Sequence, residues 1–211
     1  MKSVTISKHP LVAHKLNLLR DTTTKPKQVR ELVHEIGHLL MYEVTADMAL
    51  RQAQPRESPL ATYQGQELQN RVGLIPVLRS GLGLVDAALA MLPMAQVLHL
   101  GIYREETSLQ PVEYYNKLPS HTSVDECIVL DPVVATGGTA IATANILKDW
   151  GVSNIKFVCV CASQDGLDAF VQAHPDVAVF AGCVDQGLDS KGFVSPGTGD
   201  LGDRLFNAVN H

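Results

Sequence analysis

The sequence has no long apolar run, no CxxC spacing and no excess of basic residues. A membrane-spanning helix needs about 20 apolar residues, and no run approaches that length. The polar N-terminus has no apolar signal-peptide core, so we expect neither a membrane segment nor a secretory leader. A net charge of −5 argues against a broad nucleic-acid-binding surface, although a local cluster of arginines would still bind a small polyanion.

Cysteine usage excludes a disulfide framework. The four cysteines all lie in apolar segments without CxxC spacing; they are Cys127, Cys159, Cys161 and Cys183. Disulfides are rare in the cytosol, where buried free cysteines behave as small apolar residues. We therefore interpret all four as buried thiols of a cytoplasmic protein.

The remaining composition is that of a globular protein, with 45% hydrophobic and 18% charged residues. A length of 211 residues is sufficient for a substantial core, and we expect residues 1–211 to form a single domain. No internal repeat or low-complexity segment divides the chain.

From residue 72 onward, apolar strand-like runs alternate with helix-like segments. The expected strands are 72–78, 97–103, 127–130, 155–161 and 177–184, and the expected helices are 82–92, 140–150 and 166–173. This alternation predicts an α/β fold with a parallel sheet wound by helices on both faces. Pro76 lies inside the first strand and suggests a sheet edge or a bulge, because proline cannot donate to a strand ladder.

The first 71 residues show a different pattern. Apolar residues at helical spacing follow Pro10 and Pro26, and they predict a short helix and then a longer one. Residues 51–71 are polar and rich in turn-forming residues, so we expect a connecting arm or hairpin.

The segment 127–140, CIVLDPVVATGGTA, combines a buried strand, an acid, two glycines and the start of a helix. Glycines between a strand and a helix allow a tight turn whose N–H groups point inward, and the helix N-terminus adds partial positive charge. Such a loop is suited to phosphate. Asp131 beside it is suited to sugar hydroxyls, as the acids of nucleotide sites are. The segment therefore predicts a ribose-5-phosphate site. An ordinary strand-to-helix turn is the weaker interpretation, because such a turn does not need an acid, two threonines and two glycines so close together.

Charged residues follow four of the expected strands at their carboxyl ends: Arg79, Arg104, Asp131 and Asp185. Ligands of parallel sheets bind beyond these ends, so the four residues predict a site there. Residues 104–124 are long for a loop and hold two tyrosines, and we expect a flap that closes over the substrate. The glycine-rich tail after Asp185 is expected to be a recognition loop that ends in a short helix at 203–209.

Two motifs do not support the functions usually attached to them. Residues 34–38 fit HExxH, but a helical wheel turns His34 and His38 away from the apolar stripe, and a catalytic zinc needs a third ligand from another segment. We expect solvated histidines without zinc. Residues 197–202 fit GxGxxG, yet too few residues follow for the strand–helix–strand unit of a dinucleotide site.

Together these segments resemble the uracil phosphoribosyltransferase branch of the type I phosphoribosyltransferases. DPVVATGGT at 131–139 resembles the loop that binds phosphoribosyl pyrophosphate (PRPP), with Pro132 where most relatives have a second acid. Three further segments match the branch in the same order: IPVLRSGLG at 75–83, GIYREETSLQPVEYYNKLP at 101–119 and GFVSPGTGDLGDRLF at 192–206. The resemblance implies a type I phosphoribosyltransferase fold with a flap or hairpin arm, and the reaction of uracil with PRPP to give UMP and pyrophosphate.

The resemblance also implies roles for individual residues. Arg104 and Asp200 would be catalytic, and uracil would be bound by Val194, Gly199, Asp200 and Leu201, of which Leu201 leaves the size of the base pocket open. PRPP would be bound by Arg79, Arg104, Asp131, Pro132, Val133, Val134, Ala135, Thr136, Gly137, Gly138, Thr139 and Asp200. Mg²⁺ would arrive with PRPP and not on direct protein ligands. A homodimer or higher homo-oligomer and a GTP effector are implied by the resemblance alone.

Two alternatives from other functional classes stay open on the sequence. A pyrimidine-sensing regulator that binds RNA would keep the same PRPP motif, although the acidic balance of the chain argues against it. The other alternative is a degenerate relative without activity, but Arg79, Arg104, Asp131 and Asp200 are all intact.

Overall fold

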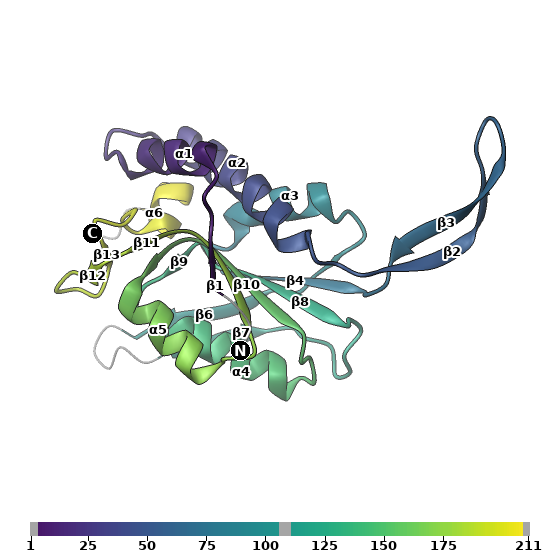
Figure 1. Cartoon of the computed structure of the whole chain (residues 1–211). Helices are drawn as coiled ribbons and strands as arrows, with labels where there is room; N and C mark the ends of the chain where they lie inside the picture. The colour runs from purple at the N-terminus through teal and green to yellow at the C-terminus, as the bar shows by residue number, and fades with distance from the viewer. Residues whose placement is uncertain (1–3, 106–110, 209–211) are drawn as a thin grey trace.

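The computed structural model describes residues 4–105 and 111–208. Within these ranges the chain forms a nine-stranded sheet with helices on both faces, as Figure 1 shows, and two small antiparallel ribbons. The strands of the large sheet are β1 (Val4–Ile6), β4 (Val72–Leu78), β5 (Gln96–Val97), β6 (Leu100–Arg104), β7 (Pro111–Asn116), β8 (Glu126–Leu130), β9 (Val133–Val134), β10 (Ile155–Ser163) and β11 (Ala178–Asp185). Their order is β1-β11-β10-β8-β4-β6-β7, with β5 beside β4 and β9 beside β10.

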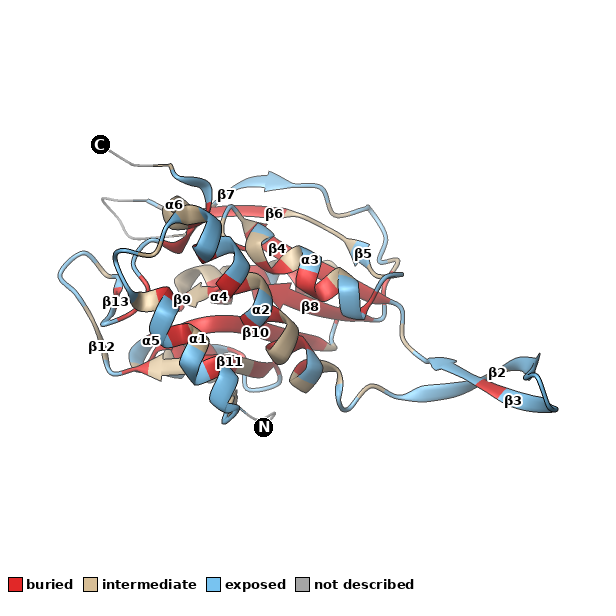
Figure 2. Cartoon of the chain, turned by 90° about the horizontal axis from the view of Figure 1, so that it is seen from above, coloured by how far each residue is buried: buried red, intermediate tan, exposed pale blue. Residues whose placement is uncertain are grey.

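The sheet predicted from the alternating pattern is confirmed as mostly parallel. Its pairs are parallel except for β6 with β7. The strands β8 and β10 are buried along their whole length, which Figure 2 shows in red. Burial of both faces explains why these strands are continuous apolar runs in the sequence.

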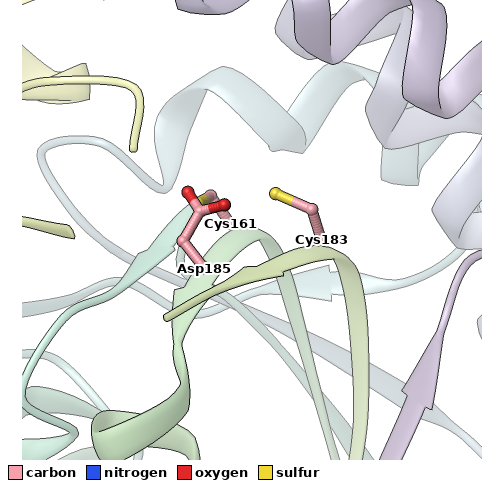
Figure 3. A group of neighbouring side chains, drawn as sticks. All are labelled: Cys161, Cys183 and Asp185. Carbon is pink, nitrogen blue, oxygen red and sulfur yellow. The ribbon is translucent and has the colours of Figure 1, made fainter. Parts of the chain in front are cut away.

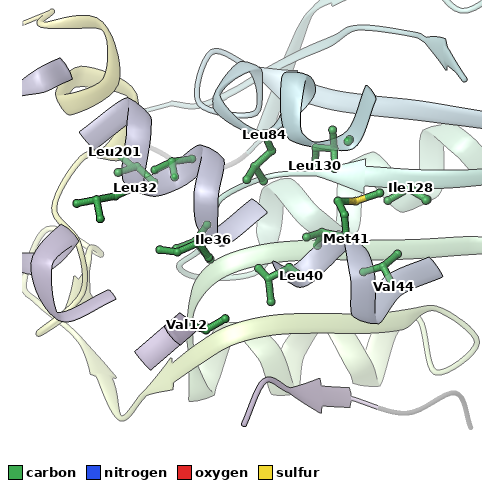
Figure 4. Packing of buried hydrophobic residues seen from close by; sticks show 14 of the residues in the cluster. Val12, Leu32, Ile36, Leu40, Met41, Val44, Leu84, Ile128, Leu130 and Leu201 are labelled. Atoms are coloured by element: carbon green, nitrogen blue, oxygen red, sulfur yellow. The ribbon is translucent and has the colours of Figure 1, made fainter. Parts of the chain in front are cut away.

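The helices form one layer on each side of the sheet (Figure 1). One layer contains α1 (Pro10–Arg20), α2 (Pro26–Thr45), α3 (Leu82–Met91) and α6 (Leu201–Phe206), and the other contains α4 (Gly138–Asp149) and α5 (Gln164–Ala173). The two predicted N-terminal helices begin at Pro10 and Pro26, because the fixed φ of proline suits the first helical position. Each layer has its own apolar core. Figure 4 shows Ile36, Leu40 and Val44 of α2 packed in the first.

The predicted hairpin arm is also confirmed. The strands β2 (Leu50–Glu57) and β3 (Thr62–Leu68) pair with each other and extend away from the sheet and its helices (Figures 1 and 2). Along both strands only Gly65 is buried, and Leu60 at the turn is 97% exposed. The arm therefore contributes no buried side chains to either apolar core.

Three details of the sequence interpretation are wrong. Pro76 lies in a central strand and not at an edge, and the pairing of β4 shows no register shift that would mark a bulge. Pro76 falls where the neighbour of β4 on one side changes from β5 to β6, so the missing N–H is tolerated. The expected strand 97–103 is split into β5 and β6. The segment 104–124 is not a loop throughout, because β7 returns antiparallel to β6 and extends the sheet.

The arrangement of β4 and β8 creates the place for a ligand site. These strands are neighbours, but the chain continues from β4 to β6 on one side and from β8 to β10 on the other. The helices that follow them, α3 and α4, lie on opposite faces. This is a topological switch point, where open parallel sheets have a crevice beyond the strand ends. Arg79 and Asp131, which follow β4 and β8, both lie at this crevice.

None of the helices in residues 4–105 and 111–208 is long and apolar enough to cross a membrane.

Candidate active site

The predicted phosphate loop forms a small hollow after β8. Its volume is about 90 Å³, and its lining consists of Asp131, residues 133–137, Thr139 and Ala140. Gly137 has a φ of 82° and precedes α4, and a Cβ on it would lie 2.5 Å from the carbonyl oxygen of Gly166. Because only glycine fits, the loop can turn tightly and bring the N-terminus of α4 to the hollow.

The far side of this loop is held by α5. Ser163 at the start of α5 accepts a hydrogen bond from the Gly166 N–H (2.9 Å) and donates one to the carbonyl oxygen of Ala135. Ser163 is completely buried. The sequence interpretation did not assign it a role, because the contact joins residues that are far apart in the chain.

Asp131 is a buried carboxylate with few donors around it. The side chain is 6% exposed, the Ser80 hydroxyl lies 3.5 Å from it, and the Val133 N–H donates to it. Burial raises the pKa of Asp131 to about 7, and the two donors only partly oppose this rise. The ionised carboxylate therefore has few hydrogen-bond donors around it. The hydroxyls of a ligand, or the waters of a hydrated metal ion, would supply more.

A second cavity of about 270 Å³ adjoins the hollow, because Val133 and Ala135 line both. The rest of its lining comes from the end of β4, from β6 and from the tail: Leu78, Arg79, Ser80, Tyr103, Gly192, Phe193, Gly199, Asp200, Leu201 and Gly202. The phosphate loop, the turn after β4 and the tail, which are separate in the sequence, thus form one continuous site.

Arg79 is held in this cavity by α6. Its guanidinium lies 2.9 Å from the carboxylate of Asp203, and the N–H of Asp203 in turn donates to Asp200, the residue that caps α6 (2.9 Å). The sequence interpretation missed Asp203, although the residue lies in the segment 192–206 that carries the family resemblance.

The residues predicted to bind the base are only partly brought together. Gly199, Asp200 and Leu201 line the second cavity. Val194 does not; it is buried in the ribbon of β12 (Gly187–Leu188) and β13 (Val194–Ser195). Leu201 is 2% exposed and also packs in the core beside α2, so core packing restricts its position.

Two other strand-end residues have different outcomes. Arg104 ends β6 next to the cavity residue Tyr103, but its side chain lies outside the described residues, and its role stays a prediction. Asp185 does not line either cavity. Its carboxylate is bound by Arg20 of α1, with both oxygens 2.8 Å from guanidinium nitrogens.

Asp185 also belongs to the one cluster of three metal-ligating side chains found among the described residues. Its oxygen and the sulfurs of Cys161 and Cys183 lie within 4.8 Å of one another (Figure 3). The guanidinium of Arg20 already occupies both carboxylate oxygens, and its positive charge opposes a metal cation. The four cysteines, all in the described part, form no disulfide, and Cys183 is only half-buried, contrary to expectation.

The two histidines of the HExxH motif are half-buried and not fully solvated as expected. His34 and His38 pack edge to face, with ring centroids 4.5 Å apart, and Glu35 forms an ion pair with Lys15 (2.6 Å). Within the described residues they do not join a cluster of three ligating groups.

The family model and the curated relatives identify one family, and solved structures share the fold. A family model described as uracil phosphoribosyltransferase matches residues 6–208. A uracil phosphoribosyltransferase of Roseiflexus castenholzii is 52% identical over 98% of this chain and 99% of its own. The structure of the AQ2163 protein from Aquifex aeolicus superposes with a TM-score of 0.92 at 31% identity, covering 99% of this chain and 100% of that one. A hypoxanthine-guanine phosphoribosyltransferase from Bacillus anthracis shares the fold, with a TM-score of 0.53 at 11% identity over 76% of this chain and 80% of its own.

The half-buried histidines give a first prediction. Replacing both His34 and His38 by alanine should leave the fold and the turnover of the enzyme unchanged, because no third ligand approaches them in the described residues. Elemental analysis of the purified wild type should find no stoichiometric zinc. One zinc per chain that disappears in the double variant would contradict this interpretation.

The buried carboxylate gives a second prediction. The folded pKa of Asp131 is raised above the unfolded value, so its contribution to stability falls as the pH rises from about 4 to about 7. Asp131→Asn removes this penalty, and the Tm of the ligand-free variant should exceed that of the wild type by more at pH 8 than at pH 5.5. Calorimetric scans at both pH values would measure the difference.

The control is Asp149→Asn, which removes an exposed carboxylate at the end of α4. It should show the same small Tm change at both pH values. An Asp131→Asn variant that is less stable than the wild type at pH 8 would show that the carboxylate is stabilised by partners in the ligand-free protein.

Proposed function

The chain belongs to the uracil phosphoribosyltransferase family, and we propose that it transfers the 5-phosphoribosyl group of PRPP to uracil, giving UMP and pyrophosphate. The observation that carries this proposal is the pair of adjoining cavities. A phosphate cradle with a buried carboxylate opens into a cavity lined by Arg79 and the glycine-rich tail. The reaction is a step of pyrimidine salvage, because it makes a nucleotide from a free base.

The cradle is the proposed site of the ribose 5-phosphate. Residues 131–139 would surround the phosphate with backbone N–H groups and the hydroxyls of Thr136 and Thr139. Asp131, at the edge of the hollow, would accept hydrogen bonds from the ribose hydroxyls. These donors would stabilise the ionised form of a carboxyl group whose pKa is raised by burial.

The second cavity is the proposed site of bond breaking. Pyrophosphate is a good leaving group, so the protein does not need a nucleophile; it must neutralise developing charge and exclude water from an oxocarbenium-like sugar. Arg79 lines the cavity and is oriented by Asp203, and Arg104 follows the cavity residue Tyr103 in β6. We assign charge neutralisation to these two arginines.

The donor set at the site fits Mg²⁺ that is carried by PRPP. Mg²⁺ keeps several waters and is usually held by one or two carboxylates together with substrate phosphates. The carboxylates that line the two cavities, Asp131 and Asp200, belong to no cluster of three ligating groups in the described residues. Mg²⁺ would neutralise part of the pyrophosphate charge, and Asp200 would face its hydration shell.

Uracil would be recognised by the backbone of the tail. Of the polar tail residues Ser195, Thr198 and Asp200, only Asp200 lines the cavity, whereas Gly192, Gly199 and Gly202 bring the main chain to its surface. Uracil presents an acceptor, a donor and an acceptor along O2, N3–H and O4. Backbone N–H, C=O and N–H groups complement this order and leave N1 free to meet the ribose.

The exposed arm supports a homo-oligomer. The arm is exposed almost throughout, and its exposed apolar side chains include Leu50, Leu60 and Tyr63. Burying these side chains against a second copy of the chain would remove apolar surface from water. We propose a homodimer or higher assembly of a single-domain chain. A GTP effector rests on the family resemblance alone. The free cysteines favour the reducing cytoplasm.

The proposed reaction is tested directly by UMP formation from uracil and PRPP with Mg²⁺, followed by chromatography. The wild type should turn over, and Arg104→Ala should lower kcat by about 10²–10³, which is typical for the loss of one charge-stabilising donor. Arg71→Ala is the control, because Arg71 precedes β4 at the opposite end of the strand. Equal turnover of the wild type and Arg104→Ala would remove Arg104 from the site, and no UMP from the wild type would refute the reaction.

Backbone recognition predicts strong discrimination against cytosine. Cytosine reverses the donor and acceptor at N3 and position 4, and a fixed backbone cannot rotate to repair the two lost contacts. Each buried unpaired group costs about 1–3 kcal/mol, so kcat/KM for cytosine should be at least about a hundredfold lower than for uracil. Initial rates at saturating PRPP measure the ratio. Ser195→Ala should leave it unchanged, and a ratio within tenfold in the wild type would contradict backbone recognition.

A further inference from the structure

The pair formed by Arg20 and Asp185 does not line the second cavity, which we call the base cavity because the tail proposed to bind uracil lines it. Arg20 is the last residue of α1, and Asp185 is the last residue of β11. Their side chains form a two-pronged ion pair, with Nη1 and Nη2 each 2.8 Å from a carboxylate oxygen. The side chains are only 24% and 10% exposed, so solvent screens this pair less than the surface ion pairs of the chain.

This pair holds both polar groups of a single peptide residue in the tail. The N–H of Gly197 donates to Oδ2 of Asp185 (3.0 Å), and the carbonyl oxygen of Gly197 accepts from Nη1 of Arg20 (3.2 Å). Gly197 has a φ of 55°, and a Cβ there would lie 2.0 Å from the carbonyl oxygen of Val194. Only glycine fits this position. Because glycine has no side chain, the ion pair holds the tail through the N–H and C=O groups of its main chain.

The next tail residue is anchored to the same end of α1. Arg204 of α6 donates through Nη1 to the carbonyl oxygen of Thr198 (2.6 Å) and through Nη2 to the carbonyl oxygen of Asp21, which follows α1 (2.9 Å). Two arginines thus hold two consecutive tail carbonyls. Immediately beyond these carbonyls are Gly199, Asp200 and Leu201, which line the base cavity.

The surroundings of Asp185 argue against direct contact with a ligand. Its Oδ2 atom accepts hydrogen bonds from Arg20, from the Gly197 N–H and from the Cys161 thiol (3.3 Å). Nη2 of Arg20 also lies 3.2 Å from the sulfur of Cys183. Figure 3 shows the two thiols and the carboxylate. Hydrogen bonding by Arg20 is the main reason that the pKa of Asp185 is lowered. Both carboxylate oxygens therefore already have partners within the protein.

We propose that Arg20 and Asp185 are positioning residues that fix the base-binding tail at Gly197 and thereby set the affinity for the pyrimidine, without a comparable effect on PRPP. This inference rests on the proposed function. Most of the proposed PRPP contacts lie in the phosphate loop and at the ends of β4 and β6, and only Asp200 belongs to the tail, so we expect a smaller effect on PRPP than on the pyrimidine. The phosphate loop is held by Ser163 and α5, and neither Arg20 nor Asp185 lines its hollow.

The test compares Asp185→Asn with the wild type in steady-state kinetics, varying one substrate at a time. The asparagine keeps the shape of the side chain but loses the charge, and its amide cannot satisfy the guanidinium fork and the Gly197 N–H together. We expect the KM for uracil to rise about tenfold or more, and the KM for PRPP to stay within about threefold.

The matched control is Asp125→Asn. Asp125 also accepts two bonds from an arginine, Arg71, and one from a backbone N–H, but this pair lies before β4 and β8, away from the crevice. Both KM values should stay at the wild-type level in this control, even if its Tm falls. Arg20→Lys, which keeps the charge but not the fork, should give a smaller increase in the uracil KM than Arg20→Ala.

The measured KM values decide the proposal. A selective rise in the uracil KM, graded from Arg20→Lys to Arg20→Ala, supports it. An unchanged uracil KM, or equal rises for uracil and PRPP, overturns it and leaves the pair as a purely structural contact. If Asp185→Asn does not fold, the graded Arg20 variants decide in the same way. If the wild type makes no UMP, the proposed function itself is contradicted. If the wild type turns over normally and the variants are unaffected, only the positioning role is contradicted.

Discussion

The parallel pairing of β4 with β8 is the constraint on which the site depends. This pairing sets Pro76 beside Leu130, and it therefore brings the turn at Arg79 and the loop at Asp131 to the same edge of the sheet. The chain leaves the two strands in opposite directions, so neither connection crosses the space between their ends. The phosphate loop and the arginine turn would be unrelated segments without this register.

Each half of the site is then held from a different face of the sheet. Ser163 fixes the phosphate loop from the layer of α4 and α5, and Arg20 with Asp185 fixes the tail from the layer of α1 and α2. In both cases a side chain accepts the main-chain N–H of a residue where only glycine fits, Gly166 in one and Gly197 in the other. The side chains behind these glycines thus help to set the path of the main chain at the site.

The parts of the structure that could be predicted from the sequence are those determined by neighbouring residues. The strand, glycine turn and helix around Asp131 are local, and so are the two proline-initiated helices and the arm. Pro76 was misjudged because its tolerance depends on which strand lies beside it, and that neighbour is distant in the chain. Asp203 and the partner of Asp185 were missed for the same reason. Val194 was assigned by resemblance, and its burial in a two-stranded ribbon keeps it out of the cavity lining.

The contact between Arg20 and Asp185 joins residues that are 165 positions apart, and β1 at the N-terminus pairs with β11 near the end of the sequence. On the ribosome, the N-terminal helix layer and the phosphate loop are made well before β11. Neither β1 nor Arg20 has its partner until β11 has left the exit tunnel, and such long-range contacts are slow to form because they close large loops. The residues of the phosphate loop are therefore all made before Asp185 and before the tail that Asp185 holds, so the second cavity is completed last.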